Sequence, residues 1–169
     1  MELTGSRTIN ATRDAVWEAL NDADVLKACV PGCSEMIRNE EGGFSAVVTQ
    51  KVGPVKATFK GAVTLTDIVP QQSYTISGEG KGGAAGFAKG GAKVKLADVE
   101  DGTELSYEVE ARVGGKLAQI GSRLVDGFAK KMADKFFENF QTILEGPNEE
   151  NEPEEKKKGW LKRLVSKEE

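Results

Sequence analysis

Apolar and polar residues follow different periods in successive stretches of the chain, and each period predicts one kind of element. Residues 3–9 are predicted to form a first strand. A short helix follows in TRDAVWEALND, with Thr12 as its N-cap and apolar side chains on one face. The stretch DVLKACVPGC predicts a second short helix, which ends at Pro31 and Gly32.

Between about Ser34 and Val113 the period changes to two, which is typical of antiparallel strands with one buried and one solvated face. The stretches VKATFKGAVTLTDIVP and TELSYEVEARV show this alternation most clearly. The residues predicted to face inward are Val55, Ala57, Phe59, Val63 and Leu65 in the first stretch, and Leu105, Tyr107, Val109, Ala111 and Val113 in the second. Turn residues recur between such stretches, so we expect a series of hairpins.

After Gly114 and Gly115 the helical period returns for about thirty residues. The predicted apolar stripe consists of Leu117, Ile120, Leu124, Phe128, Met132, Phe136, Phe140 and Ile143, widened by Ala129, Ala133, Phe137 and Leu144. Such a stripe needs a large apolar surface opposite it, which the inner face of the sheet offers. We therefore predict an α+β fold: an antiparallel sheet of about seven strands curved around one long C-terminal helix, with two short helices after the first strand.

A charged run, PNEENEPEEKKK, marks the end of the predicted folded domain, residues 1–146. Pro147 cannot continue a helix, and the charge blocks after it cannot bury enough area to become ordered. We expect residues 147–158 to be a flexible linker and residues 159–169 to be a short amphipathic tail.

Composition narrows the function. A net charge of −4 argues against a nucleic-acid partner. The absence of histidine removes Ser-His-Asp and Cys-His catalysis, HExxH zinc sites and the two-His-one-carboxylate iron site. Cys29 and Cys33 are expected to be reduced thiols, with no metal site. Neither a stretch of roughly 18 apolar residues nor a secretory signal is present, so we expect a cytoplasmic protein.

The stretch GEGKGGAAGFAKGG contains a GxGxxG pattern at Gly78, Gly80 and Gly83. A dinucleotide site needs a strand before this pattern, a helix after it and a parallel βαβ unit around it, and seven glycines oppose a helix here. We interpret the stretch as a sharply bent hairpin. Phe87 at its centre either fills the core, which we favour, or gates a cavity.

Several blocks resemble the CoxG family, the G subunit of carbon monoxide dehydrogenase, within the START-like, or Bet v 1-like (SRPBCC), superfamily. These blocks are LNDADVLKACVPGC, VGPVKATFKGAVTL, SGEGKGGAAGFAKGGAKVKL and ELSYEVEARVGGKLAQIGSRLVDGFAKKMADKFFENF. The resemblance implies the helix-grip fold and a non-catalytic accessory of a molybdenum hydroxylase of the CO dehydrogenase type, involved in membrane attachment and in supplying the electron acceptor. Other family members occur beside hydroxylases unrelated to CO oxidation, so the partner's substrate stays open.

The helix-grip resemblance also implies a cavity between sheet and helix that suits a flat apolar molecule. We expect no tightly bound cofactor, and a quinone, ubiquinone or menaquinone, as the lipophilic ligand. The residues expected to line the cavity are Arg7, Gln50, Ala57, Phe59, Gly61, Tyr74, Phe87, Tyr107, Leu124 and Phe128. Arg7 and Gln50 are polar residues that the alternation points inward, where each needs a hydrogen-bonding partner such as a quinone carbonyl. The alternative is that both lie at strand ends and reach water.

The tail is predicted to be a reversible membrane anchor, peripheral on the inner face of the cell membrane. Its apolar face and cations suit an anionic lipid surface. The residues involved are Lys158, Trp160, Leu161, Lys162, Arg163, Leu164 and Val165. The alternatives are a disordered tail that binds nothing and a tail that docks on a protein.

Two other functions compete with the ligand-binding accessory. One is a polyketide cyclase-like enzyme, or a START-like lipid or small-molecule binding protein, unrelated to CO oxidation. An enzyme needs an acid and a base that converge in the pocket, whereas most carboxylates here fall on the solvated face. The other is a structural adaptor whose interior is filled, which predicts no pocket above about 300 Å³.

Overall fold

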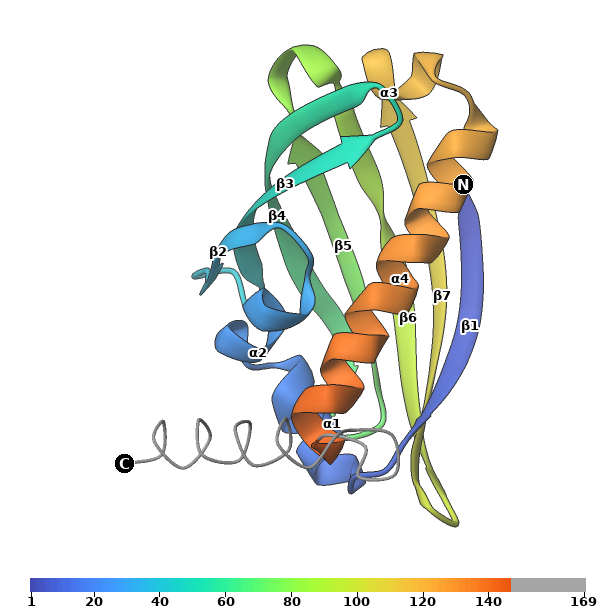
Figure 1. Cartoon of the computed structure of the whole chain (residues 1–169). Helices are drawn as coiled ribbons and strands as arrows, with labels where there is room; N and C mark the ends of the chain where they lie inside the picture. The colour runs from blue at the N-terminus through green and yellow to red at the C-terminus, as the bar shows by residue number, and fades with distance from the viewer. Residues whose placement is uncertain (147–169) are drawn as a thin grey trace, which may run out of the picture.

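The computed structural model describes residues 1–146 and contains a strongly curved antiparallel sheet with a long helix lying across its concave face (Figure 1). Two short helices follow the first strand and cover one end of the concave side. The predicted α+β helix-grip architecture is therefore confirmed. The predicted linker, 147–158, and the predicted tail, 159–169, lie outside the described residues.

The elements, in chain order, are β1 (Glu2–Ile9), α1 (Arg13–Leu20), α2 (Ala23–Cys29), β2 (Cys33–Arg38), β3 (Phe44–Val52), β4 (Val55–Val69), β5 (Ser73–Lys81), the 3₁₀ turn η1 (Gly83–Ala85), β6 (Phe87–Val99), β7 (Gly102–Gly114), α3 (Lys116–Gln119) and α4 (Ser122–Glu145). The seven strands lie in the order β1-β7-β6-β5-β4-β3-β2, and each neighbouring pair is antiparallel. Within residues 1–146 no helix is both long and apolar enough to span a membrane.

Local capping explains where the short helices begin. Thr12 is the N-cap of α1, and its Oγ1 accepts a hydrogen bond from the amide of Ala15 at 3.2 Å. Asp22 caps α2 in the same way, through the amides of Asp24 and Val25. The α2 helix ends at Cys29, whose carbonyl accepts a hydrogen bond of 3.0 Å from the side chain of Asn139 on α4. This bond ties the short helices to the long one.

The hydrophobic core is concentrated where α1 and the C-terminal half of α4 meet the sheet. Ile9, Val16, Leu105 and Phe140 are at most 1% exposed. The buried residues that α4 contributes to this cluster, Phe137 and Phe140, both lie in its second half. In the first half of α4, only Val125 is buried.

A row of small residues crosses the middle of the sheet. Gly78 on β5 pairs with Gly90 on β6, which pairs with Ala111 on β7. A Cβ added at Gly90 would lie 2.1 Å from the carbonyl oxygen of Glu110, and one added at Gly78 would lie 2.4 Å from that of Ala62. Neighbouring backbones approach closely here, as the predicted glycine-rich bent hairpin requires.

The long C-terminal helix is confirmed, but it begins later than the apolar stripe predicts, because the first part of the stripe forms the separate helix α3. Helix α3 ends at Gln119 and α4 begins at Ser122, because Gly121 adopts a φ of 97° that a right-handed helix cannot contain. The predicted apolar stripe also differs at both ends of α4. Leu124 and Ile143, both assigned to the buried stripe, are 50% and 41% exposed, whereas Val125 is buried.

Candidate functional site

An apolar pocket of about 390 Å³ opens on the concave face of the sheet. Its size lies within the usual range for small-molecule sites. The lining residues all belong to strands β2–β7, and the larger side chains among them are Met36, Phe44, Val48, Phe59, Val63, Ile76 and Val109. The pocket exceeds the limit that a filled structural adaptor predicts.

Small residues create this space. Gly61, Gly78, Gly80 and Gly90 present no side chain at the floor of the pocket, and Ala92 beside them has only a methyl group. These positions continue the apolar face of the strands but add little or no side-chain volume. The pocket is the space that remains above this face, and no helix residue of the described chain lines it.

Two of the expected lining residues, Phe59 and Gly61, are in the wall of the pocket. Ala57 shares their face of β4 and is half-buried, but it lies beyond the lining residues. Ile76 was missed, although Tyr74, Ile76 and Gly78 alternate in the sequence with polar residues. Extending the period-two pattern through this strand would have placed Ile76 in the pocket.

Arg7 and Gln50 face inward, as the alternation predicts, but each has a partner within the protein. The guanidinium of Arg7 forms an ion pair with Asp134 of α4 and lies 5.6 Å from the ring centroid of Phe137. The side-chain amide of Gln50 donates to the carbonyl of Pro31. Neither side chain therefore needs a ligand carbonyl, and both lie outside the pocket lining.

Tyr74 and Tyr107 were expected in the pocket wall, but both belong to the buried core. Tyr74 is 5% exposed and packs edge-on against Trp17 at 5.4 Å between ring centroids. Burial raises the pKa of its hydroxyl, so the group stays neutral. Tyr107 stacks on Phe137 at 5.0 Å. Their aromatic partners come from helices distant in the sequence, which strand alternation does not reveal.

Phe87 does not fill the core, and this prediction is wrong. The register of β6 gives it the same side as Lys95 and the opposite side from the buried Val94, and its side chain is 42% exposed. A Cβ added at Gly114 would lie 2.2 Å from Cε1 of Phe87, so the ring packs over that glycine. Leu124 was also expected in the cavity but is exposed, and Phe128 on α4 is half-buried outside the pocket lining.

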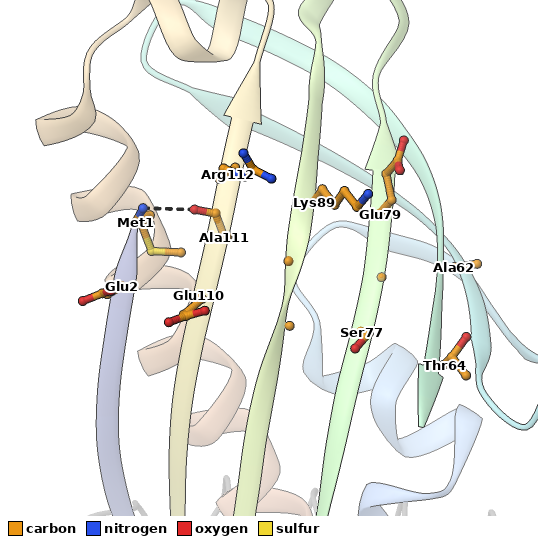
Figure 2. A pocket seen from close by; sticks show the side chains of 13 residues that line it. Met1, Glu2, Ala62, Thr64, Ser77, Glu79, Lys89, Glu110, Ala111 and Arg112 are labelled. Atoms are coloured by element: carbon orange, nitrogen blue, oxygen red, sulfur yellow. Dashed lines mark hydrogen bonds between the residues drawn. The ribbon is translucent and has the colours of Figure 1, made fainter. Parts of the chain in front are cut away.

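A second hollow, of about 830 Å³, lies on the convex face (Figure 2). Its side chains carry mixed charge, from Glu79, Lys89, Glu110 and Arg112, and the Met1 amine donates to the carbonyl of Ala111 at 3.0 Å. The backbone of Gly78, Gly90 and Ala111 borders both hollows, so the wall between them is one strand layer thick. The lining of the convex hollow mixes charged and apolar groups, whereas that of the concave pocket is mostly apolar, so the concave pocket is the candidate site for a lipophilic ligand.

Other candidate chemistry is weak in the described part of the chain. Burial raises the pKa of the Cys29 thiol to about 11, which keeps it protonated and unreactive at neutral pH. Residues 1–146 contain no cluster of three His, Cys, Asp or Glu side chains suited to a metal. The GxGxxG pattern spans an antiparallel hairpin, β5–β6, as predicted, and not the βαβ unit of a dinucleotide site.

Solved structures share this fold. A conserved protein from Geobacillus kaustophilus is 31% identical, with a TM-score of 0.79, and the match covers 85% of this chain and 95% of that one. Protein CV1439 from Chromobacterium violaceum is 12% identical over 88% of this chain and 99% of its own, with a TM-score of 0.66. TTHA0849 from Thermus thermophilus is 11% identical over 85% and 97%, also with a TM-score of 0.66.

No curated protein matches the chain. The model of the CoxG family, described as the G subunit of carbon monoxide dehydrogenase, matches residues 5–145, which includes every strand of the pocket. The resemblance noted in the sequence blocks is thereby confirmed, and the chain belongs to the CoxG family.

Proposed function

We propose that this protein is a non-catalytic accessory of a molybdenum hydroxylase of the CO dehydrogenase type, and that its concave pocket binds a lipophilic quinone. The family name supports an association with CO dehydrogenase. The observation that carries the ligand proposal is the pocket itself: about 390 Å³, lined by aliphatic and aromatic side chains and by glycines. A flat ring suits such a space because glycines leave room on the apolar wall between the larger side chains.

The inward polar side chains already have partners within the protein, which favours a weakly held ligand over a tightly bound cofactor. The inward polar side chains, Arg7 and Gln50, are engaged by Asp134 and Pro31. Contacts to the ligand are then mainly apolar, and apolar contacts are non-directional. A molecule held in this way exchanges readily. Ready exchange is what a protein needs if it supplies an electron acceptor to a partner enzyme.

The proposal excludes catalysis by the pocket residues. Proton transfer needs an acid or base within hydrogen-bonding reach of the substrate. The side chains on the pocket side of the wall are apolar, while Glu79, Lys89 and Glu110 contribute to it from strand positions whose side chains face the convex hollow (Figure 2). Among residues 1–146, those that line the pocket with side chains on the concave face carry no titratable group.

Attachment of the partner to the cell membrane is the third part of the proposal. It assigns the contact to the tail, through Trp160, Leu161, Leu164 and Val165 on one face and through Lys158, Lys162 and Arg163 beside it. Cations add to lipid affinity only where the surface is anionic, so this attachment should weaken at high salt.

Mass spectrometry of organic extracts tests the ligand. Full-length protein is purified without detergent and extracted beside an equal amount of an unrelated protein from the same cells. We expect ubiquinone or menaquinone in the first extract at a clear excess over the second. Equal amounts in both extracts, together with no binding of added quinone, would contradict the quinone proposal.

A further inference from the structure

We infer that the folded part of the chain has a lipid-binding surface of its own, at the end of the sheet opposite the C-terminus of α4. This surface, called the Leu124 end, comprises the β3–β4 turn (residues 51–56), the β5–β6 connection (81–87) and the β7–α4 connection (114–124). Figure 1 shows these three segments together at one end of the molecule. The expected partner is an anionic phospholipid bilayer.

The three segments adjoin one another. A Cβ added at Gly53, in the first segment, would lie 3.4 Å from Cδ1 of Leu124 and 4.0 Å from Cδ1 of Ile120. Gly86 and Gly115 are also close, since a Cβ on Gly115 would lie 2.7 Å from the Cα of Gly86. The Leu124 end is therefore one continuous surface and not three separate loops.

Large apolar side chains protrude from this surface. Leu124 is 50% exposed and Phe87 is 42% exposed, each on a different segment. Pro54, Ala84 and Ala118 are exposed beside them. The free energy falls when exposed apolar groups of this kind enter the boundary between headgroups and acyl chains.

Charge selects an anionic surface as the partner. The charged side chains of the three segments are all cations, and all are exposed: Lys51, Lys56, Lys81, Lys116 and Arg123. Lys81 also lies 3.6 Å from Glu79, so its charge is partly neutralised. Acidic residues gather away from this end: Glu40, Glu41, Glu100 and Asp101 lie in turns, and Asp67 and Asp98 lie near the ends of β4 and β6. Asp98 lies 3.5 Å from Arg13, so its charge is partly neutralised as well. This asymmetry orients the Leu124 end toward a negative surface.

The composition fits lipid better than protein. Lysine is depleted in protein interfaces, whereas four of the five cations here are lysines. Long lysine side chains can keep their ammonium groups at the phosphate level while Leu124 and Phe87 lie deeper. The apolar residues are also separated by cations, which suits a headgroup layer more than a dry protein contact.

This contact is distinct from the one proposed for the tail. Helix α4 has 24 residues and so extends about 36 Å from the Leu124 end before the chain continues toward residues 147–169. One consequence rests on the proposed function: docking at this end would bring the pocket residues Phe59, Gly80 and Ala88, which lie nearest to it along their strands, close to the bilayer. An apolar ligand could then pass between membrane and pocket with little exposure to water.

Vesicle co-sedimentation of the full chain tests the inference, with phosphatidylglycerol–phosphatidylcholine vesicles compared with pure phosphatidylcholine. Leu124→Glu and the double variant Lys51→Glu/Lys116→Glu should each lower partitioning onto the anionic vesicles about tenfold or more, since one cation near such a surface contributes about fivefold. Ile143→Glu is the matched control. It places the same charge on the same helix at a side chain that is 41% exposed, but at the far end.

A depth readout separates this surface from the tail. A fluorophore is attached to Leu124→Cys or to Ile143→Cys, each in a Cys33→Ser background, and is quenched by brominated lipid in the same vesicles. Strong quenching at position 124 and weak quenching at 143 is expected. Equal quenching at both positions, or none at 124, would overturn the inference. So would a Leu124→Glu variant that partitions normally but no longer captures the hydroxylase, because the surface would then be a protein interface. Quinone content is measured separately, so neither result bears on the pocket.

Discussion

Arg7 shows how one residue links the helix to the sheet. It lies on the inner face of β1 and reaches Asp134 and the ring of Phe137 on α4. The side chains of Arg7 and Asp134 are 30% and 52% exposed, so solvent screens the ion pair. We therefore assign Arg7 a modest role in holding α4 in place and no role in ligand binding.

Replacing Arg7 by methionine should lower the free energy of unfolding by about 1 kcal/mol or less, as measured by urea denaturation. Quinone affinity should stay within about twofold, because Arg7 does not line the pocket. A loss of affinity without a loss of stability would show that the arginine does contact the ligand.

Cys29 gives stability a dependence on alkaline pH. Its thiol is buried, and its pKa is raised from 9.0 to about 11. The folded protein therefore holds this proton more tightly than the unfolded chain does. The stabilisation is fully present below pH 9 and is lost as the pH rises toward 11.

We expect the melting temperature to fall between pH 9 and 11, and to fall less steeply in Cys29→Ala. The comparison of slopes removes any uniform cost of the substitution. Tyr74 also contributes to alkaline destabilisation, because burial raises the pKa of its hydroxyl as well. Parallel slopes for the two proteins would contradict the assignment to Cys29.

At the scale of elements, a break at Gly121 separates α3 from α4. Gly121 has a φ of 97° with open space around it, whereas Gly127 lies inside α4, also with open space around it. An added methyl group therefore meets no atoms at either site. The two positions differ in backbone conformation alone.

Gly121→Ala should destabilise the fold by about 1 kcal/mol or more, because a side chain is strained at this φ. Gly127→Ala should stabilise it by about 0.5–1 kcal/mol, because alanine favours a helix interior. Urea denaturation of both variants measures the difference. Stabilisation by both would mean that α3 and α4 join into one helix in solution.

Element ends and contacts across the core mark the limit of sequence interpretation for this chain. Strand alternation predicted the inner faces of β4 and β7 correctly, because those strands pair through long, continuous registers. It did not predict the exposure of Leu124, which lies in the first turn of α4 at the end of the sheet, or that of Phe87, because β6 begins at Phe87 on the convex side. Tyr74 and Tyr107 were expected in the pocket because alternation gives the face of a residue but not its partner across the core.

At the scale of the whole molecule, the described fold and the tail are given separate roles. The folded part has a large curved surface for a partner, whereas a short tail offers too few ordered contacts for an interface of standard size. Partner docking is therefore predicted to use the folded part.

A protein truncated after Gly146 should still capture the hydroxylase in a pull-down. The same protein should partition onto anionic vesicles more weakly than the full chain, since it keeps the Leu124 end and loses residues 147–169. Loss of the hydroxylase on truncation would assign partner binding to the tail. An unchanged vesicle affinity would remove the tail from membrane attachment.

The central claim is that the concave pocket holds the ligand, and a matched pair of alanine substitutions tests it. Ala92 lines the pocket from the concave side of β6, whereas Ala97 lies on the convex side of the same strand and is exposed. Titration of full-length protein with a short-chain quinone, followed by calorimetry, gives the affinity of each variant, and thermal melts confirm that each is folded. The account predicts that Ala92→Phe abolishes binding and that Ala97→Phe binds like the unmodified protein. Binding by folded Ala92→Phe at unchanged affinity would contradict it.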